Sequence, residues 1–158
     1  MSLVVWRIVQ RRLASHALSG DGARRYGGRW NSPGIAVVYT AQSQSLAALE
    51  ILVHIDSGEL LQNYNAIPIT VDESLIMRTD ASTLPRNWRA YPSTKATRLL
   101  GDSWLIEEKT AVLQVPSAVI PTESNFLLNP GHRDFCKLTA GKSIAFKFDS
   151  RLARNSRS

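Results

Sequence analysis

The arginine- and glycine-rich segment at residues 22–31 constrains this chain more than any other feature. It holds three arginines and three glycines around two aromatic rings, Tyr26 and Trp30. Glycine lets a ligand approach the backbone closely, and each guanidinium presents a fixed fork of donors for phosphate or carboxylate. The rings supply flat faces for a base or a nicotinamide ring. Residues 20–34 are therefore expected to form an irregular loop that binds an anionic nucleotide.

An apolar run follows at residues 46–53, with one carboxylate, Glu50, in its middle. Asp and Glu are rarely fully buried without a partner. Glu50 therefore either turns to water or faces an internal cleft where Arg29 or Arg25 meets it, because an unpaired acid there would have a raised pKa. The flanking apolar residues favour the cleft. The alternative for these arginines is structural: ion pairs with Asp21 or Glu50 that pin the loop.

Length and composition indicate one domain with an ordinary hydrophobic core, since the chain has 158 residues. No apolar run approaches the roughly 20 residues that span a bilayer, and residues 1–10 lack the apolar core of a signal peptide. Cys136 is the only cysteine, so no disulfide within the chain is expected, which fits a reducing cytoplasm. A small packed side chain is the favoured interpretation of Cys136, ahead of a nucleophile. We expect a cytoplasmic protein.

The net charge of +6 favours anionic partners: nucleotides, nucleic acid or an acidic protein. The basic residues are scattered, and no Lys/Arg run or continuous basic helix indicates a dedicated nucleic-acid-binding motif. The three histidines show no metal-ligand spacing with each other or with Cys136, so no metal site is expected. The glycine fingerprints of dinucleotide-binding and phosphate-binding loops are absent, and any nucleotide is therefore held in another way.

The order of apolar runs favours an α+β fold. Strands are predicted at residues 4–9, 35–39, 63–71, 110–115 and 143–148. Pro68 places the third of these at a sheet edge. One helix begins at Ser43 or Ser45, and another covers residues 93–108 with an interruption near Gly101. Hairpin-like strands with few helices argue against a doubly wound sheet.

Two further residues have both a functional and a structural interpretation. Tyr39 closes the second predicted strand and either stacks on a nicotinamide ring or packs as a core aromatic. Ser117, at a strand end, either hydrogen-bonds a ligand or caps a turn. It lies in no G-x-S-x-G elbow, so a hydrolase triad is unsupported.

Taken in order along the chain, these motifs resemble the RES-domain family. The matching segments are Gly-x-Gly-Ala-Arg-x-x-Gly-Gly-Arg-Trp-Asn at residues 20–31 and the stretches at 37–41, 45–54, 101–104, 115–121 and 125–132. The resemblance covers residues 6–151, so we expect one RES domain at 1–151 and a disordered tail at 152–158. The glycine at Gly131, where relatives often carry a bulkier or charged residue, is a departure that affects loop geometry.

The resemblance implies a fold like that of ADP-ribosyltransferases, with mixed or antiparallel sheets and a few short helices around an NAD cleft. RES proteins are toxins of type II toxin–antitoxin modules. They deplete NAD by breaking the nicotinamide–ribose bond, some with phosphate as acceptor, and others modify a protein. NAD is then the substrate, and no prosthetic group is expected.

The resemblance also implies site residues. The arginine, glutamate and serine that give the family its name fall at Arg29, Glu50 and Ser117, with Arg25 as the alternative arginine. Ser117 would orient the ribose or the pyrophosphate. The residues expected to bind NAD are Arg25, Tyr26, Arg29, Tyr39 and Asn125.

The partner implied by the family is an Xre-type helix-turn-helix antitoxin that covers the cleft, and a homodimer is a further expectation. Direct nucleic-acid binding and membrane association are not expected. Two alternatives stay open: a protein mono-ADP-ribosyltransferase that uses the same pocket, and a non-catalytic basic module that binds nucleic acid or protein.

Overall fold

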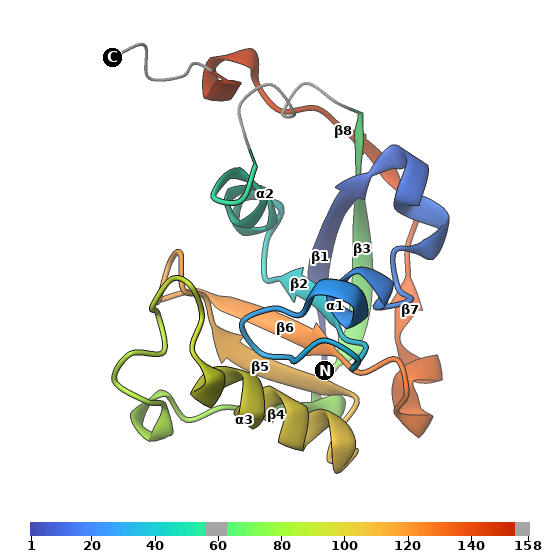
Figure 1. Ribbon diagram of the computed structural model, residues 1–158. Helices are drawn as coiled ribbons and strands as arrows, with labels where there is room; N and C mark the ends of the chain where they lie inside the picture. The colour runs from blue at the N-terminus through green and yellow to red at the C-terminus, as the bar shows by residue number, and fades with distance from the viewer. Residues whose placement is uncertain (56–62, 154–158) are drawn as a thin grey trace, which may run out of the picture.

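The computed structural model describes residues 1–55 and 63–153, and it confirms the α+β class. Eight strands form one sheet in the order β4-β5-β6-β2-β1-β3-β7, with β8 also paired to β3 (Figure 1). Only β4 and β5 run parallel; the other paired strands are antiparallel. The strands are β1 (Ser2–Gln10), β2 (Val38–Ala41), β3 (Tyr64–Asp72), β4 (Ile76–Arg78), β5 (Val112–Pro116), β6 (Ser124–Leu128), β7 (Thr139–Ala140) and β8 (Ile144–Phe146).

The two halves of the sheet meet at one short junction. β1 pairs with β3 along all nine residues, and β2 pairs with β6 along all four. Between β1 and β2, in contrast, the register holds a single pair, Trp6↔Ala41. In Figure 1, β1 and β3 run steeply across the direction of β5 and β6. The sheet is therefore strongly curled, and it opens between β1 and β2.

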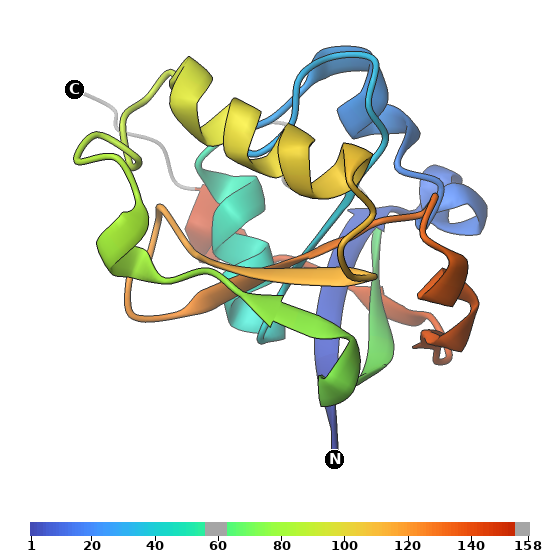
Figure 2. The ribbon, with the colours of Figure 1, turned by 90° about the horizontal axis from the view of Figure 1, so that it is seen from below.

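Within the described residues, three α-helices and several 3-10 turns surround the sheet. They are α1 (Asp21–Tyr26), α2 (Gln44–Leu52), α3 (Lys95–Ile106), η1 (Arg11–His16), η3 (Glu73–Leu75), η4 (Ala81–Thr83), η5 (Arg133–Lys137) and η6 (Ser150–Ala153). The predicted start of α2 is confirmed, because Ser43 Oγ accepts the Leu46 N–H at 3.1 Å as an N-cap. Figure 2 shows α3 between the β4–β5 part of the sheet and the segment that carries α1.

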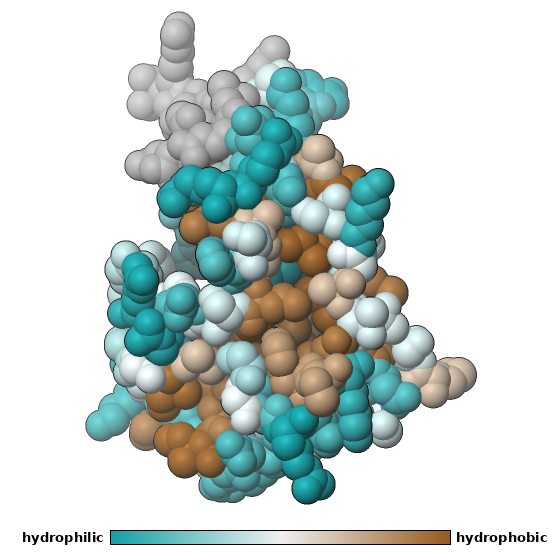
Figure 3. Space-filling model, turned by 90° about the vertical axis from the view of Figure 1, so that its right-hand side faces the viewer, coloured by the Kyte–Doolittle hydropathy of each residue, from teal (hydrophilic) through white to brown (hydrophobic). Residues whose placement is uncertain are grey.

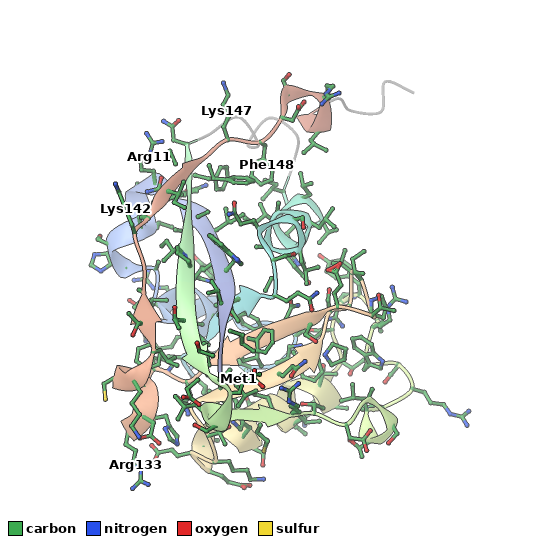
Figure 4. The ribbon with its side chains drawn as sticks, turned by 180° about the vertical axis from the view of Figure 1, so that it is seen from behind. Met1, Arg11, Arg133, Lys142, Lys147 and Phe148 are labelled. Atoms are coloured by element: carbon green, nitrogen blue, oxygen red, sulfur yellow. The ribbon has the colours of Figure 1, made fainter. Side chains whose placement is uncertain are left out.

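Three apolar clusters fill the interior of the described structure. One gathers around Val5 of β1 and its register partner Ile69 of β3, and it extends to residues of β2, β5 and β6. In the second, α2 packs through Leu46 near Phe148, which Figure 4 shows directed into the molecule. In the third, Trp104 of α3 packs in the cluster that holds Trp30. The third cluster therefore connects α3 to the arginine-rich segment.

The prediction that Pro68 marks an edge strand is wrong. β3 lies inside the sheet, between β1 on one side and the short strands β7 and β8 on the other. β8 pairs with residues 64–66 and β7 with residues 69–70, so Pro68 falls in the gap between them. The missing proline N–H therefore removes no ladder hydrogen bond, while its carbonyl accepts the Gly141 N–H at 2.7 Å.

Other boundaries also differ from the predictions. α3 runs through Gly101 without the expected interruption. The predicted loop at residues 20–34 contains α1, and β2 begins at Val38 rather than at residue 35. β6 was not predicted. It is paired on both sides, with β2 and β5, and these long-range partners decide its conformation.

Cys136 is exposed in η5, where its Sγ donates to the Arg133 carbonyl at 3.4 Å, so the packed side chain that was predicted is wrong. The expected tail at 152–158 begins inside η6, and residues 154–158 lie outside the described residues. Within residues 1–55 and 63–153, no helix has both the length and the apolar character to cross a membrane.

The surface mixes polar and apolar groups. Figure 3 shows one side of the molecule, where apolar side chains gather in the middle and polar ones surround them. In Figure 4, Arg11, Lys142 and Lys147 project outward at one end of the molecule, and Arg133 does so at the other. The basic residues that the figure labels are thus spread over two ends, as their scatter along the sequence predicts.

Gly101 is expected to tolerate no side chain. A Cβ at this position would lie 1.7 Å from the Trp30 carbonyl oxygen, a backbone atom that cannot move alone. We expect Gly101→Ala to lower the free energy of unfolding by about 2–4 kcal/mol, measured by urea denaturation. The control is Gly22→Ala in α1, where nothing lies within 4 Å of the new Cβ; it should be neutral or stabilising by up to about 1 kcal/mol. Equal stabilities for the two variants would contradict the close contact.

Candidate functional site

A cleft of about 1030 Å³ lies where the sheet opens. Its walls come from β1, β2, β6 and α2, from residues 22–30 of the arginine-rich segment, and from the loop segments at residues 89–93 and 118–119. The cleft therefore lies at the β1–β2 junction. It brings together two parts of the sequence that were predicted to meet, the arginine-rich segment and the helix that carries Glu50.

Glu50 reaches the cleft from α2 and is half-buried. Its Oε1 accepts two hydrogen bonds, from Ser117 Oγ at 2.7 Å and from Asn125 Nδ2 at 2.8 Å. Both partners belong to the β5–β6 hairpin and lie far from Glu50 in sequence. The prediction that Glu50 faces a cleft is confirmed. Its Oε1 meets neutral donors, and no ion pair with an arginine forms in the described part of the chain.

Ser117 caps a turn, which is one of its two predicted interpretations. It is fully buried, and its Oγ accepts the N–H groups of Val119 and Ile120, each at 3.1 Å. A hydroxyl has one proton to donate, and here that proton goes to Glu50. Ser117 is not among the residues that line the cleft. The geometry therefore favours a positioning role toward Glu50 over the expected contact with ribose or pyrophosphate.

Arg29 lines the cleft and is held by backbone groups. Its Nη1 donates to the carbonyls of Trp88 at 2.7 Å and Ala90 at 2.9 Å, while other guanidinium donors remain available. Burial lowers the pKa of Arg29; the charges of Glu50 and Tyr39 oppose this shift, and the Arg89 charge adds to it. The guanidinium is thus fixed and partly desolvated.

Arg25, the alternative arginine, is exposed at the end of α1 and is not part of the cleft lining. Tyr26, its neighbour, lines the cleft with 82% of its surface exposed. The two adjacent side chains therefore differ: Tyr26 is available at the rim of the cleft, and Arg25 is outside it.

Tyr39 lines the cleft, and its hydroxyl supports the arginine-rich segment. The hydroxyl donates to Asn31 Oδ1 at 2.6 Å and accepts the Trp30 N–H at 3.1 Å. Burial raises the pKa of Tyr39, so its hydroxyl stays protonated and keeps donating. A Cβ on Gly28 would lie 2.6 Å from this hydroxyl, so the position next to Arg29 requires glycine.

Arg7 is a candidate that sequence reasoning missed. It projects from β1 into the cleft lining, and its Nη1 donates to the Tyr39 carbonyl at 2.9 Å. Its Nε is buried without a hydrogen-bond partner in the described structure, and burial lowers the pKa of Arg7 to about 10. The available signal was an arginine inside the apolar run at residues 4–9. A buried guanidinium without a carboxylate is suited to an anionic ligand.

His54 also lines the cleft, and its ring lies 6.1 Å from that of Tyr91. Across residues 1–55 and 63–153, no group of three or more His, Cys, Asp or Glu side chains is arranged to hold a metal ion. The chemistry that the described site offers is that of one fixed carboxylate among arginines, aromatic rings and amides.

The Glu50–Asn125 contact predicts a pH-dependent stability in one variant. Asn125→Asp would place a second carboxylate about 3 Å from Glu50 Oε1, and two carboxylates so close raise the pKa of the pair. An acid with a raised pKa in the folded state loses its stabilising effect as pH rises through that pKa. We expect the free energy of unfolding of this variant to fall by about 2 kcal/mol between pH 5 and pH 8, beyond any wild-type change.

Asn65→Asp is the matched control, because the Asn65 side chain accepts from Arg11 Nε at 3.2 Å and a carboxylate there would meet a cation. Its stability should follow the wild-type pH dependence, measured by urea denaturation at each pH. The same pH profile in both variants would contradict the Glu50–Asn125 contact.

Known proteins resemble this chain in sequence and in fold. A model of the RES domain family matches residues 4–149. The chain is 42% identical over 152 residues to "Toxin Res" of Yersinia enterocolitica, covering 95% of this chain and 99% of that protein. It is 38% identical over 159 residues to the "Prs ADP-ribosylating toxin" of a Sphingobium species, covering 98% and 99%.

Among solved structures, the fold is similar to that of a chain in the crystal structure of the M.tuberculosis MbcT-MbcA toxin-antitoxin complex. The TM-score is 0.71 at 22% identity, covering 97% of this chain and 87% of that one. The sequence motifs, the family model and near-full-length relatives lead to the same conclusion: this chain belongs to the RES domain family.

Proposed function

We propose that this chain is a toxin that depletes NAD by cleaving the bond between nicotinamide and ribose. The observation that carries the proposal is the Glu50 carboxylate, whose Oε1 is held by Ser117 and Asn125 inside a cleft lined by Arg7 and Arg29. Relatives over nearly the full length are named as toxins. A pocket of about 1030 Å³ is large enough for a dinucleotide.

The chemistry follows from charge. When the C1′–N bond of NAD breaks, its electron pair goes to the nicotinamide nitrogen. Nicotinamide then leaves as a neutral molecule, and positive charge develops on the ribose. A carboxylate fixed in advance stabilises that charge without reorganising. Glu50 is the acid that lines the cleft, and its Oε2 has no hydrogen-bond partner in the described residues. Water then forms a bond to C1′ and loses a proton to solvent, or a phosphate oxygen forms that bond with its negative charge, and the reaction is complete.

The remaining cleft residues bind and orient the dinucleotide. Arg7 and Arg29 carry guanidinium donors toward the cleft and would hold the two negative charges of the pyrophosphate. Tyr39 and Tyr26 offer ring surfaces for the nicotinamide. Holding both ends of NAD fixes the scissile bond beside Glu50, which lowers the entropic part of the barrier.

A second candidate function is mono-ADP-ribosylation of a protein in the same cleft. It is favoured by the relative named "Prs ADP-ribosylating toxin", which matches almost the whole chain. Adenylate-labelled NAD separates the two functions. Label that appears in free ADP-ribose or its phosphate supports depletion, whereas label on a protein from a cell extract supports transfer. A non-catalytic basic module would consume no NAD and would bind nucleic acid in a salt-dependent way.

We also propose that an antitoxin, of the Xre helix-turn-helix type, covers this cleft. A similar fold occurs in a toxin–antitoxin complex, and the cleft rim exposes Tyr26, Val53 and Tyr91, which are aromatic and aliphatic side chains of the kind that protein interfaces bury. Inhibition of NAD loss by the purified antitoxin, measured in the same assay, is the corresponding test.

Glu50→Gln should remove NAD cleavage and keep the fold. The amide oxygen of glutamine still accepts from Ser117 and Asn125, but the negative charge is lost. We expect nicotinamide release from pure NAD to fall by about 10²–10³-fold, with the unfolding midpoint little changed. Glu107→Gln, at an exposed ion pair with Lys109, is the control and should retain wild-type turnover. Wild-type turnover by Glu50→Gln would remove Glu50 from the mechanism.

Arg29→Ala and Arg25→Ala form a second matched pair, since both arginines lie in the same segment and one of them lines the cleft. Loss of a charged hydrogen-bond donor to pyrophosphate should raise the KM for NAD by about 10–100-fold in Arg29→Ala. Arg25→Ala should change KM by less than about twofold, as expected for an exposed charge. The reverse ranking would make Arg25 the principal arginine.

A further inference from the structure

α3 touches the arginine-rich segment and the residue that follows it, Ser32, through two residues that the proposed mechanism has not used, Gly101 and Asp102. At Gly101 the helix backbone lies against the Trp30 carbonyl so closely that no side chain fits. Figure 2 shows α3 alongside that segment. The contact places the next residue of the helix, Asp102, beside the chain that follows Arg29.

Asp102 is a buried carboxylate, with 7% of its surface exposed. Both of its oxygens are used by one residue: Oδ1 accepts the Ser32 N–H at 2.8 Å, and Oδ2 accepts the Ser32 hydroxyl at 2.5 Å. None of the ion pairs in the described chain involves Asp102. The two hydrogen bonds to Ser32 therefore satisfy the polar atoms of this buried side chain.

From Ser32 the hydrogen bonds continue to the cleft. The neighbouring Asn31 is fully buried, and its Nδ2 donates to the carbonyls of Ala23 and Ile35. Asn31 Oδ1 accepts from Tyr39, whose hydroxyl in turn accepts the Trp30 N–H. The backbone from residue 30 to residue 32 is thus fixed from α3 on one side and from β2 on the other. Arg29 is the next residue along this fixed stretch.

We propose that Asp102 is a positioning residue that, by holding Ser32 from α3, sets where the Arg29 guanidinium lies in the cleft. Asp102 does not line the cleft, so it acts through the backbone of the arginine-rich segment. The effect of Asp102 on turnover can be measured only if the proposed function holds. A second measurement, hydrogen exchange, does not depend on activity.

The alternative is that these hydrogen bonds serve stability alone, and a double-mutant cycle with Arg29 separates the two roles. Asp102→Ala should lower kcat/KM for NAD by about 10–100-fold, mainly through KM, because a misplaced binding group loses much of its effect. In an Arg29→Ala background the same substitution should lower kcat/KM by less than about threefold, since the group being positioned is already gone. A full additional drop in that background would overturn the proposal, and so would an unchanged kcat/KM in the single variant.

The chain offers a matched control in Asp80. This carboxylate also accepts the N–H and the hydroxyl of one serine, Ser82, at 2.9 and 2.7 Å, but it is exposed and lies outside the cleft. Asp80→Ala removes the same chemistry from another site and should leave kcat/KM at the wild-type value. An equal loss of kcat/KM in the two alanine variants would show that Asp102 has no special relation to Arg29.

Hydrogen exchange followed by mass spectrometry gives the readout that is independent of catalysis. The segment at residues 27–35 should exchange at least about tenfold faster in Asp102→Ala than in wild type, with no such change in Asp80→Ala. If the wild-type protein releases no nicotinamide, the proposed function is wrong and exchange alone decides the positioning role. Unchanged exchange at 27–35 would then overturn it.

If Asp102→Ala does not fold, two variants that remove less of the contact with Ser32 test the same proposal. Ser32→Ala removes the hydroxyl bond and keeps the N–H bond. Asp102→Asn keeps an acceptor for the Ser32 N–H and should restore most of the activity lost in the alanine variant. The expected order of kcat/KM is wild type, then Asp102→Asn, then Asp102→Ala; an asparagine variant as poor as the alanine variant would contradict the role of the retained hydrogen bond.

Discussion

The single pairing between β1 and β2 is the constraint on which the rest of the structure depends. β2 is fully paired with β6 but meets β1 at one position only, so the two strands diverge and a cleft forms between them. Where the two strands diverge, the Arg7 guanidinium of β1 donates a hydrogen bond to the Tyr39 carbonyl of β2. α2 begins directly after β2, and this brings Glu50 to the opening.

The groups that line this opening are fixed before any ligand arrives. Glu50 Oε1 is held by two donors, and one of them, Ser117, is itself oriented by two backbone N–H groups. Arg29 is held by two backbone carbonyls of the loop that faces it. A charge held in this way need not reorganise when charge develops on a substrate, which is the main source of electrostatic stabilisation in enzymes. The hydrogen bonds to backbone groups therefore hold these charged side chains in place before a ligand binds.

The sequence predicts the features that depend on neighbours along the chain. The Ser43 cap, the helix around Glu50 and the resemblance over residues 20–31 are local patterns. Features set by distant partners were not predictable in this way. Pro68 is accommodated because β7 and β8 leave a gap, and Gly101 is required by a residue in another part of the chain.

The residues of the candidate site also fall into two groups: those that a local sequence pattern identifies and those that depend on distant partners. Glu50 could be identified because it is the one carboxylate in an apolar run, and Arg29 because the family resemblance names it together with Arg25 as the alternative. The exact contacts of Ser117 depend on a partner 67 residues away, which no local pattern encodes. Arg7 is a single arginine in an apolar strand, and its place in the cleft depends on how β1 and β2 separate. Arg25 resembles Arg29 in sequence, yet Arg25 lies on α1 outside the cleft, whereas Arg29 follows the end of that helix and lines the cleft.

The charges of the cleft support the proposal of an anionic ligand. Burial lowers the pKa of both Arg7 and Arg29, which means that their ionised forms are less well solvated there than in water. On the outer surface, Arg24 and Arg78 have carboxylates within ion-pair distance, at Asp21 and Glu73. A pyrophosphate in the cleft would restore interactions that the buried guanidinium groups lack, and by mass action it would stabilise the fold. Burial of the charged arginines therefore lowers the stability of the free protein. The same burial strengthens their interaction with an anion when it binds.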